Sequence, residues 1–397
     1  MIAAALAAVV LASPAVRVGL ERIERAQGGV LAGKAVGLVA HAASVTLDGR
    51  HAIDVLRESN VRIVRVFAPE HGLFGRAAAG EQVASGRDAV SGVEVVSLYG
   101  ARSAPSAREL RGLDALVIDL QDAGVRFYTY ASTMLLCLEA AADAGVPVVI
   151  LDRPNPLGGD LAAGPRRGPV GEVPLSLVSR APGPLVHGLT LGEMAQVANA
   201  ARAKPARLSV VAMDGWRRGM RWRDTGRVWV PPSPNLRTAE AALAYPGTCL
   251  FESTDATEGR GTEAPFLLLG APWIYAPALA SVRAPGFALS ITSFAPKASE
   301  AAPAPKHRDV LCQGVRVAVT DAQATRPYEL GVRLLHALRL QKGFRWTREG
   351  ALDWLVGTRA LRQALERGDT PEAILASDAE DLAAWERERA PFLLYGR

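Results

Sequence analysis

Short apolar runs alternate with longer amphipathic stretches between residues 36 and 151, and this alternation limits the fold more than any other feature of the sequence. The apolar runs are rich in β-branched residues, and helical patterns separate them at residues 53–58 and 133–144. Nearly continuous apolar strands that alternate with helices are typical of a parallel sheet covered on both faces. The pattern therefore predicts a doubly wound, Rossmann-like α/β domain. The expected strands are residues 36–40, 61–67, 93–97, 115–120 and 146–151.

The length of the chain indicates a second domain. A chain of 397 residues exceeds what one hydrophobic core usually supports. A Trp-rich stretch (Trp216, Trp222, Trp229) and the Pro-Pro-Ser-Pro-Asn segment at residues 231–235 follow the alternating region. Beyond them lie strand patterns at 287–293 and 315–320, a Pro/Ala-rich loop at 301–306 and helices from residue 330 onward. We therefore predict a Rossmann-like domain over residues 17–235 and a smaller α+β domain over residues 236–397.

The first residues are typical of an export signal. Residues 1–12 are almost wholly apolar, and the run ends at Ser13-Pro14-Ala15. This run is shorter than the roughly 20 residues that span a bilayer. It resembles the apolar region and cleavage zone of a signal peptide, although the usual basic start is missing. We assign residues 1–16 as a signal segment and expect a periplasmic or secreted protein with no membrane span.

The sequence gives no sign of a metal, a cofactor or a nucleic-acid partner. The net charge of +5 is spread along the chain without a basic run. No Gly-x-Gly-x-x-Gly follows the first strand, and there is no His-Glu-x-x-His or Gly-x-Ser-x-Gly motif. Three cysteines fit no zinc spacing; Cys249 and Cys312 either pair after export or stay free, as we expect for Cys137. The sequence does not indicate an oligomeric state.

Polar clusters follow three of the predicted strands. In an open parallel sheet, ligands bind at the carboxyl ends of the strands. Strand-end Asp residues also cap helices or form turns, so each residue alone has a structural explanation. The three clusters together favour a binding site. Their members are Glu70 and His71; Asp119, Gln121, Asp122, Arg126, Tyr128 and Tyr130; and Asp152, Arg153 and Asn155.

A fourth polar stretch lies in the second half, between Glu252 and Thr262. It contains Glu258 and Arg260, and the glycines on either side of Arg260 allow the backbone to approach a ligand closely. An arginine fork also matches a carboxylate. The alternative is a solvated loop. Nearby aromatic residues such as Tyr245 either form a platform for a sugar face or pack in the core.

Five motifs, in this order, resemble the exo-β-N-acetylmuramidase family, formerly described only as a domain of unknown function. They lie at residues 68–72, 119–130, 151–159, 231–235 and 245–262, and the resemblance runs from about Val36 to the C-terminus. It implies two domains with an active site in the cleft between them. It also implies release of terminal N-acetylmuramic acid from the non-reducing ends of peptidoglycan fragments. The segment from Ala40 to Ser44, and Ser253 and Asp255, depart from the family pattern, which bears on substrate specificity.

Glycoside hydrolysis usually needs one carboxylic acid to protonate the leaving oxygen and a second group to assist attack at the anomeric carbon. We predict that Glu70 is the acid, because it lies at a strand end beside His71. The second group stays open between Asp119, Asp122, Glu258, a tyrosine (Tyr128 or Tyr130) and the N-acetyl group of the sugar. Whether the reaction retains or inverts the anomer is also open. The predicted substrate-binding residues are His71, Gln121, Arg126, Tyr130, Asp152, Arg153, Asn155, Asn235, Glu252 and Arg260.

Three arginines, Arg126, Arg153 and Arg260, are candidates for the lactyl carboxylate that distinguishes muramic acid from glucosamine. Two other functions fit the same residues. One is an exported binding protein for anionic muropeptides, without turnover. The other is an amidase or esterase acting on cell-wall material, against which stands the lack of a nucleophile elbow or metal-ligand set.

Overall fold

A seven-stranded sheet forms the larger part of the molecule. The computed structural model describes residues 15–396, so most of the predicted signal segment, residues 1–14, lies outside the described residues. The strand order is β3-β4-β2-β1-β5-β6-β9, and every neighbouring pair is parallel except β3 with β4. This confirms the predicted Rossmann-like sheet. The strands are β1 (Ala35–Ala40), β2 (Arg62–Ala68), β3 (Gly86–Arg87), β4 (Glu94–Ser97), β5 (Ala115–Asp119), β6 (Val148–Leu151) and β9 (Leu208–Val211).

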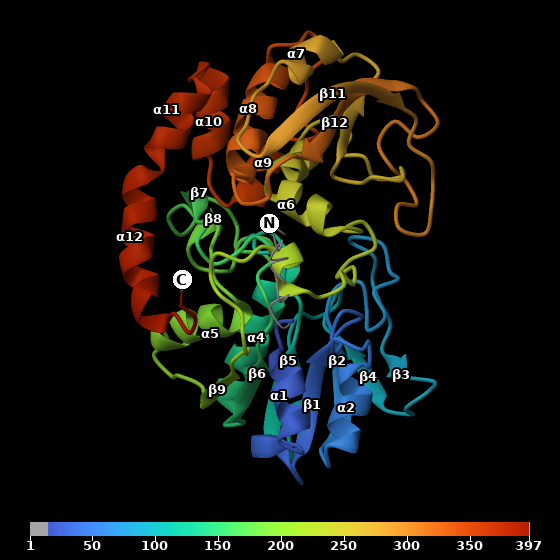
Figure 1. Cartoon of the computed structure of the whole chain (residues 1–397), viewed down its shortest axis with the longest axis vertical. Coiled ribbons are helices and arrows are strands. Elements are labelled where there is room, and N and C mark those ends of the chain that lie inside the picture. Colours follow the sequence, from blue (N-terminus) through green and yellow to red (C-terminus); the bar gives the residue numbers. More distant parts are fainter. Residues whose placement is uncertain (1–14, 397) are drawn as a thin grey trace, which may run out of the picture.

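Helices cover both faces of this sheet because its central strands carry apolar side chains on both sides. Every residue of β1 and β5 is buried. Val36 and Leu38 pack with α1 (Gly19–Arg25) and α2 (Ala52–Glu58) on one face. Val39 and Ile118 pack in the other core, which includes α3 (Ala107–Leu110), α4 (Thr129–Ala144) and α5 (Leu191–Ala200). The alternation read from the sequence thus corresponds to two helical layers (Figure 1).

A smaller unit follows, built on an antiparallel sheet in the order β10-β12-β11. Figure 1 shows this unit stacked on the end of the large sheet where β1, β2 and β5 finish. Its strands are β10 (Leu268–Ala271), β11 (Phe287–Phe294) and β12 (Cys312–Val319), and its helices are α6 (Ala239–Thr248), α7 (Ala276–Ala280), α8 (Pro327–Arg339), α9 (Ala351–Val356), α10 (Ala360–Arg367), α11 (Pro371–Ser377) and α12 (Ala379–Arg389). A two-stranded sheet of β7 (Ala163–Arg166) and β8 (Pro184–Val186) lies between the units. The exact boundary at residue 235 stays a prediction.

Helices α6 and α8 cross with their backbones almost in contact. A Cβ atom on Gly247 would lie 2.1 Å from the carbonyl oxygen of Pro327, and one on Gly331 would lie 2.7 Å from the Cα of Gly247. Only glycine fits on both sides of such a crossing. The close approach fixes the end of α6 and the 3-10 turn η3 (Cys249–Ser253) that follows it. The other 3-10 turns are η1 (Gly29–Leu31), η2 (Trp222–Thr225) and η4 (Ala390–Phe392).

The chain ends on the large unit. Helix α12 runs back past β7 and β8, and the C-terminus lies beside α5 (Figure 1). The indole nitrogen of Trp385 donates to the carbonyl of His187 at 2.9 Å. Tyr395 packs with Val16, Met213 and Trp216 in a separate small core. The last residues therefore belong to the packing of the first unit.

Two further expectations concern disulfide pairing and a membrane span. Cys137, Cys249 and Cys312 are all buried and unpaired. Within residues 15–396, no helix is both long enough and apolar enough to cross a membrane.

Candidate active site

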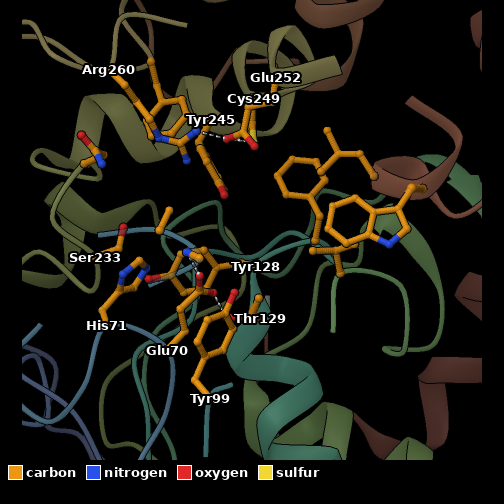
Figure 2. Close-up of a pocket in the computed structure, with 18 residues that line it drawn as sticks. Glu70, His71, Tyr99, Tyr128, Thr129, Ser233, Tyr245, Cys249, Glu252 and Arg260 are labelled. Carbon is orange, nitrogen blue, oxygen red and sulfur yellow. Dashed lines mark hydrogen bonds and ion pairs between the residues drawn. The ribbon is translucent and has the colours of Figure 1, made fainter. Parts of the chain in front are cut away.

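A cavity of about 320 Å³ lies where the two units meet. Its floor comes from the strand ends of the large sheet: Glu70 and His71 follow β2, Tyr99 follows β4, and Thr129 begins α4. The opposite wall comes from α6, η3 and the loop after it, and a side wall comes from α9. Figure 2 shows the floor and the opposite wall facing each other across the open space. The wall residues are Tyr245, Cys249, Glu252, Arg260, Phe266, Trp354 and Leu355.

Glu70 is held on the floor by two donors. Its Oε1 accepts a hydrogen bond from the backbone N–H of Gly80 at 3.0 Å, and its Oε2 accepts one from the hydroxyl of Thr129 at 2.8 Å. Only 8% of the residue is exposed. Tyr99 lies beside it, and burial, followed by the charge and hydrogen bond of Glu70, raises the pKa of that tyrosine. The result is a fixed carboxyl group at the edge of a desolvated cavity.

His71 is turned by an unusual backbone angle. Its φ of 71° lies in the left-handed region, which non-glycine residues rarely adopt. Its Nδ1 lies 2.8 Å from the carbonyl oxygen of Ala77, so Nδ1 carries the proton. Burial lowers the pKa of His71, although the charge of Glu70 works in the opposite direction. The side chain can therefore take part in neutral hydrogen bonding next to Glu70.

Arg260 is the cation of the opposite wall. It forms ion pairs with Glu252 at 2.7 Å and with Glu258 at 3.2 Å. Burial works against its charge, but these two carboxylates raise its pKa, so it stays protonated. The flanking glycines have φ values of 84° and 82°, and a side chain on either would collide with backbone oxygens. The two glycines thus allow the loop to turn tightly around Arg260.

Three residues that line the cavity carry buried polar atoms without a hydrogen-bond partner in the described chain. They are the Nε of Arg260, the hydroxyl of Tyr128 and the Oδ1 of Asn235. Such atoms are costly to bury unless something completes their hydrogen bonds. Each of the three atoms has almost no solvent-accessible surface, so they lie behind the surface of the cavity. Tyr128 stays a hydroxyl, because burial raises its pKa.

Six of the predicted site residues line the cavity, a seventh lies just behind it, and the others lie elsewhere. Those at the cavity are Glu70, His71, Tyr128, Asn235, Glu252 and Arg260 as lining residues, and Tyr130 just behind the floor. The hydroxyl of Tyr130 lies 3.1 Å from the carbonyl of Glu70 and 2.8 Å from that of Pro232, so it ties the two segments together. Glu258 is buried behind Arg260 and lines a neighbouring hollow.

Gln121 and Arg153 line a second cavity of about 280 Å³ among the loops that follow β1, β5 and β6, and Asp119 is paired with Arg153 beside it. Arg153 forms a buried ion pair with Asp119, with its Nη2 2.9 Å from Oδ2, and also donates to the carbonyl of Val45 at 3.0 Å. Gln121 donates to the carbonyl of Pro154 at 2.8 Å. These groups hold the strand ends together and do not line the cavity that contains Glu70.

The remaining four predicted residues also make contacts within the fold and do not line the Glu70 cavity. Asp122 accepts from the N–H of Gly124 at 2.7 Å and lies 3.4 Å from His187. Arg126 donates to three backbone carbonyls, including that of Val356 at the end of α9. Burial lowers its pKa to about 9. Asp152 and Asn155 bind backbone and hydroxyl groups near α5; their partners are Thr190, Gly192, Tyr395, Leu157 and Leu189.

Sequence reasoning missed several residues of the cavity. Tyr99 follows the end of β4, so the strand-end argument applied to that strand would have found it. Thr129 was inside a recognised motif but was not singled out. Trp354 and Leu355 belong to α9, far along the chain, and no local signal marks them.

Comparisons with known proteins cover almost the whole chain. The profile described as "Exo-beta-N-acetylmuramidase NamZ, N-terminal" matches residues 36–240, and the corresponding C-terminal profile matches residues 243–395. The peptidoglycan beta-N-acetylmuramidase NamZ of Bacillus subtilis (strain 168) is 37% identical over 389 residues, which are 96% of this chain and 92% of that protein. Two crystal structures of DUF1343 family proteins from Bacteroides fragilis superpose with TM-scores of 0.85 and 0.78. Each is 29% identical, and the match covers 96% of this chain and 99% of the other.

Proposed function

The chain belongs to the exo-β-N-acetylmuramidase family of glycoside hydrolases, and from this premise we propose that the cavity above Glu70 is where it removes terminal N-acetylmuramic acid from the non-reducing ends of peptidoglycan fragments. A relative with this activity on peptidoglycan matches over nearly its full length. The cavity, at about 320 Å³, is near the lower end for small-molecule sites and suits one substituted sugar ring. A site that takes one terminal sugar matches an exo-acting enzyme.

The observation that carries this proposal is the position of Glu70. It is a buried carboxyl group that faces the cavity from the end of β2, and the N–H of Gly80 and the hydroxyl of Thr129 fix its orientation. We assign it as the acid that protonates the leaving glycosidic oxygen. The other lining carboxylate, Glu252, is engaged by Arg260. Of the groups predicted to assist the attack, Tyr128 lines the cavity.

Arg260 is the arginine that we assign to the lactyl carboxylate of muramic acid. It lines the cavity, whereas Arg126 is bound to backbone carbonyls and Arg153 to Asp119. Both of its ion pairs use Nη1 and its side chain is 22% exposed at the cavity, so Nη2 is left as a donor for a third carboxylate. We also propose export to the periplasm or the medium, on the basis of the apolar residues 1–12. Cell fractionation with an antibody against the chain tests the location.

The experiment measures hydrolysis of two substrates, one with a nitrophenol leaving group and one with a saccharide leaving group. Nitrophenol leaves easily and needs little protonation, whereas a sugar alcohol needs an acid. Glu70→Gln should therefore lower kcat/KM about 10²- to 10⁴-fold on the saccharide and much less on the nitrophenyl β-N-acetylmuramide. Glu263→Gln, at an exposed position, is the control and should match the parent. Equal losses on the two substrates would remove Glu70 from the role of acid.

Selectivity tests Arg260. The parent should hydrolyse the nitrophenyl muramide and leave the matching glucosaminide, which lacks the lactyl group, almost untouched. Arg260→Gln should bring the two rates together by slowing the muramide, and Arg260→Lys should restore part of the preference because it keeps the charge. An unchanged preference in Arg260→Gln would show that another group reads the lactyl carboxylate.

A further inference from the structure

Two more hollows continue the cavity toward the surface. The first lies between residues 78–81 and residues 301–306, and it shares Ala79, Gly80 and Arg260 with the cavity. The second lies along residues 71–77 and reaches Glu300; it shares His71 with the cavity and Glu81 and Pro303 with the first hollow. Their volumes are about 490 and 570 Å³. The two hollows adjoin each other and the cavity at these shared residues, and we call the two hollows together the outer groove.

The walls of the outer groove are fixed although neither contains a helix or strand. In the loop after β2, the carboxylate of Glu81 accepts from the N–H of Ala78 at 2.8 Å. In the loop after β11, the carbonyl of Ala301 accepts from the side chain of Asn235 at 2.7 Å, and Lys306 forms an ion pair with Glu258 at 3.2 Å. Figure 1 shows the loop after β11 extending from the smaller unit toward the large unit. Contacts within the fold therefore hold both of the loops that wall the groove.

The inner end of the groove lies next to the proposed acid. The N–H of Gly80, which is part of the groove wall, donates directly to Oε1 of Glu70. A general acid gives its proton to the oxygen of the leaving group, so the leaving saccharide must lie on the side of the bound sugar where the acid lies. The inner end of the outer groove lies on that side, beside Glu70.

The outer end of the groove offers an exposed aromatic ring. Phe74 is 54% exposed, which is unusual for a phenylalanine, and it lines the second hollow together with Arg76 and Pro303. The first hollow is walled largely by alanine and proline, small side chains that leave room for a ring. A flat aromatic face with polar groups around it suits the apolar face of a sugar.

We propose that the outer groove binds the leaving part of the substrate, a chain of β-linked N-acetylated amino sugars. The first sugar beyond the cleaved bond lies between Gly80 and Pro303, and a following sugar lies against Phe74. This rests on the proposed function, because it takes Glu70 as the acid. The proposal predicts that the enzyme prefers substrates with several sugars beyond the cleaved bond. The cavity itself holds one sugar and would not produce this preference.

The test compares two substrates within each variant. One is the nitrophenyl β-N-acetylmuramide, which has no saccharide beyond the bond. The other is a peptide-free tetrasaccharide of alternating N-acetylmuramic acid and N-acetylglucosamine, with N-acetylmuramic acid at its non-reducing end. The readout is the ratio of kcat/KM for the tetrasaccharide to kcat/KM for the nitrophenyl substrate, so general damage to the enzyme cancels. Phe74→Ala should lower this ratio about 3- to 10-fold, the size expected for an aromatic contact.

Two further variants and a control sharpen the result. Phe74→Trp should keep the ratio, and Ala304→Trp should lower it by filling the first hollow from an exposed position. Val90→Ala, which is 92% exposed and lies outside the groove, is the control and should match the parent. A ratio that is the same in the parent, Phe74→Ala and Ala304→Trp would overturn the groove. If the parent hydrolyses neither substrate, the proposed function itself is wrong.

Discussion

Asp152 gives a stability prediction whose size can be worked out from the structure. It lies just after β6, fully buried, and accepts hydrogen bonds from the hydroxyl of Thr190 at 2.7 Å, the N–H of Gly192 at 2.9 Å and the hydroxyl of Tyr395 at 2.5 Å. Burial raises its pKa from 3.8 to about 6, even though these donors favour the charged form. A difference of this size corresponds to about 3 kcal/mol.

The sign follows from counting protons. Between about pH 4 and pH 6 the folded protein keeps a proton on Asp152 that the unfolded chain has released. The free energy of unfolding contributed by this group therefore falls as the pH rises through that window. Above it, the folded protein carries the full cost of about 3 kcal/mol for a buried charge. The carboxylate thus weakens the fold at neutral pH relative to a neutral group of the same shape.

Asp152→Asn removes that charge and keeps the size of the side chain. From pH 4 to pH 8, the free energy of unfolding of the variant should rise relative to the parent by about 3 kcal/mol. Urea unfolding followed by tryptophan fluorescence at several pH values measures it, and the difference between the two proteins cancels the other titrating groups. Asp143→Asn, at an exposed position, is the control and should show a constant difference. A pH-independent difference for Asp152→Asn, or one that moves against the variant as the pH rises, would refute the reasoning.

Two other predictions concern the supports of the cavity. Tyr130→Phe keeps the ring against His41 but removes the hydroxyl that ties Glu70 to Pro232, so we expect kcat to fall about 3- to 10-fold and the free energy of unfolding to fall by about 1 kcal/mol. Steady-state kinetics and urea unfolding check this, and an unchanged kcat would contradict it. Gly247→Ala should cost about 3 kcal/mol or more in urea unfolding, because its Cβ would meet a carbonyl oxygen at 2.1 Å. Gly219→Ala, where nothing lies within 4 Å of the new Cβ, is the matched control, and equal stability of the two variants would contradict the close crossing of α6 and α8.

The central strands of the large sheet could be predicted because their full burial leaves a mark in each strand's own sequence. β1 and β5 are buried on both sides, so the sequence at each is an unbroken apolar run. β9 was missed: it is an edge strand, and none of its four residues is fully buried. Burial alone did not decide which strands could be predicted, because the partly exposed β4 and β11 were predicted and the fully buried β10 was not.

The site could be predicted only in part, because the same side chains serve binding and folding. The strand-end clusters were predicted to form one site, yet only part of them lines the cavity, because the role of each side chain depends on which partner folds against it. Arg126 illustrates this: its three acceptors are backbone carbonyls, which sequence does not distinguish from any others. Trp354 reaches the cavity from a helix more than 200 residues beyond α4, and only the tertiary fold brings it there.

The return of the chain to the large unit has a consequence for its resistance to proteases. Tyr395 completes the small core with Val16 and Trp216, and Arg389 donates to the carbonyl of Gly159 at 3.1 Å. Residues far apart in the sequence therefore close one face of the large unit together. If α12 and the residues after it were removed, Trp216 would lose its cover, and proteases would reach the segments that α12 now shields.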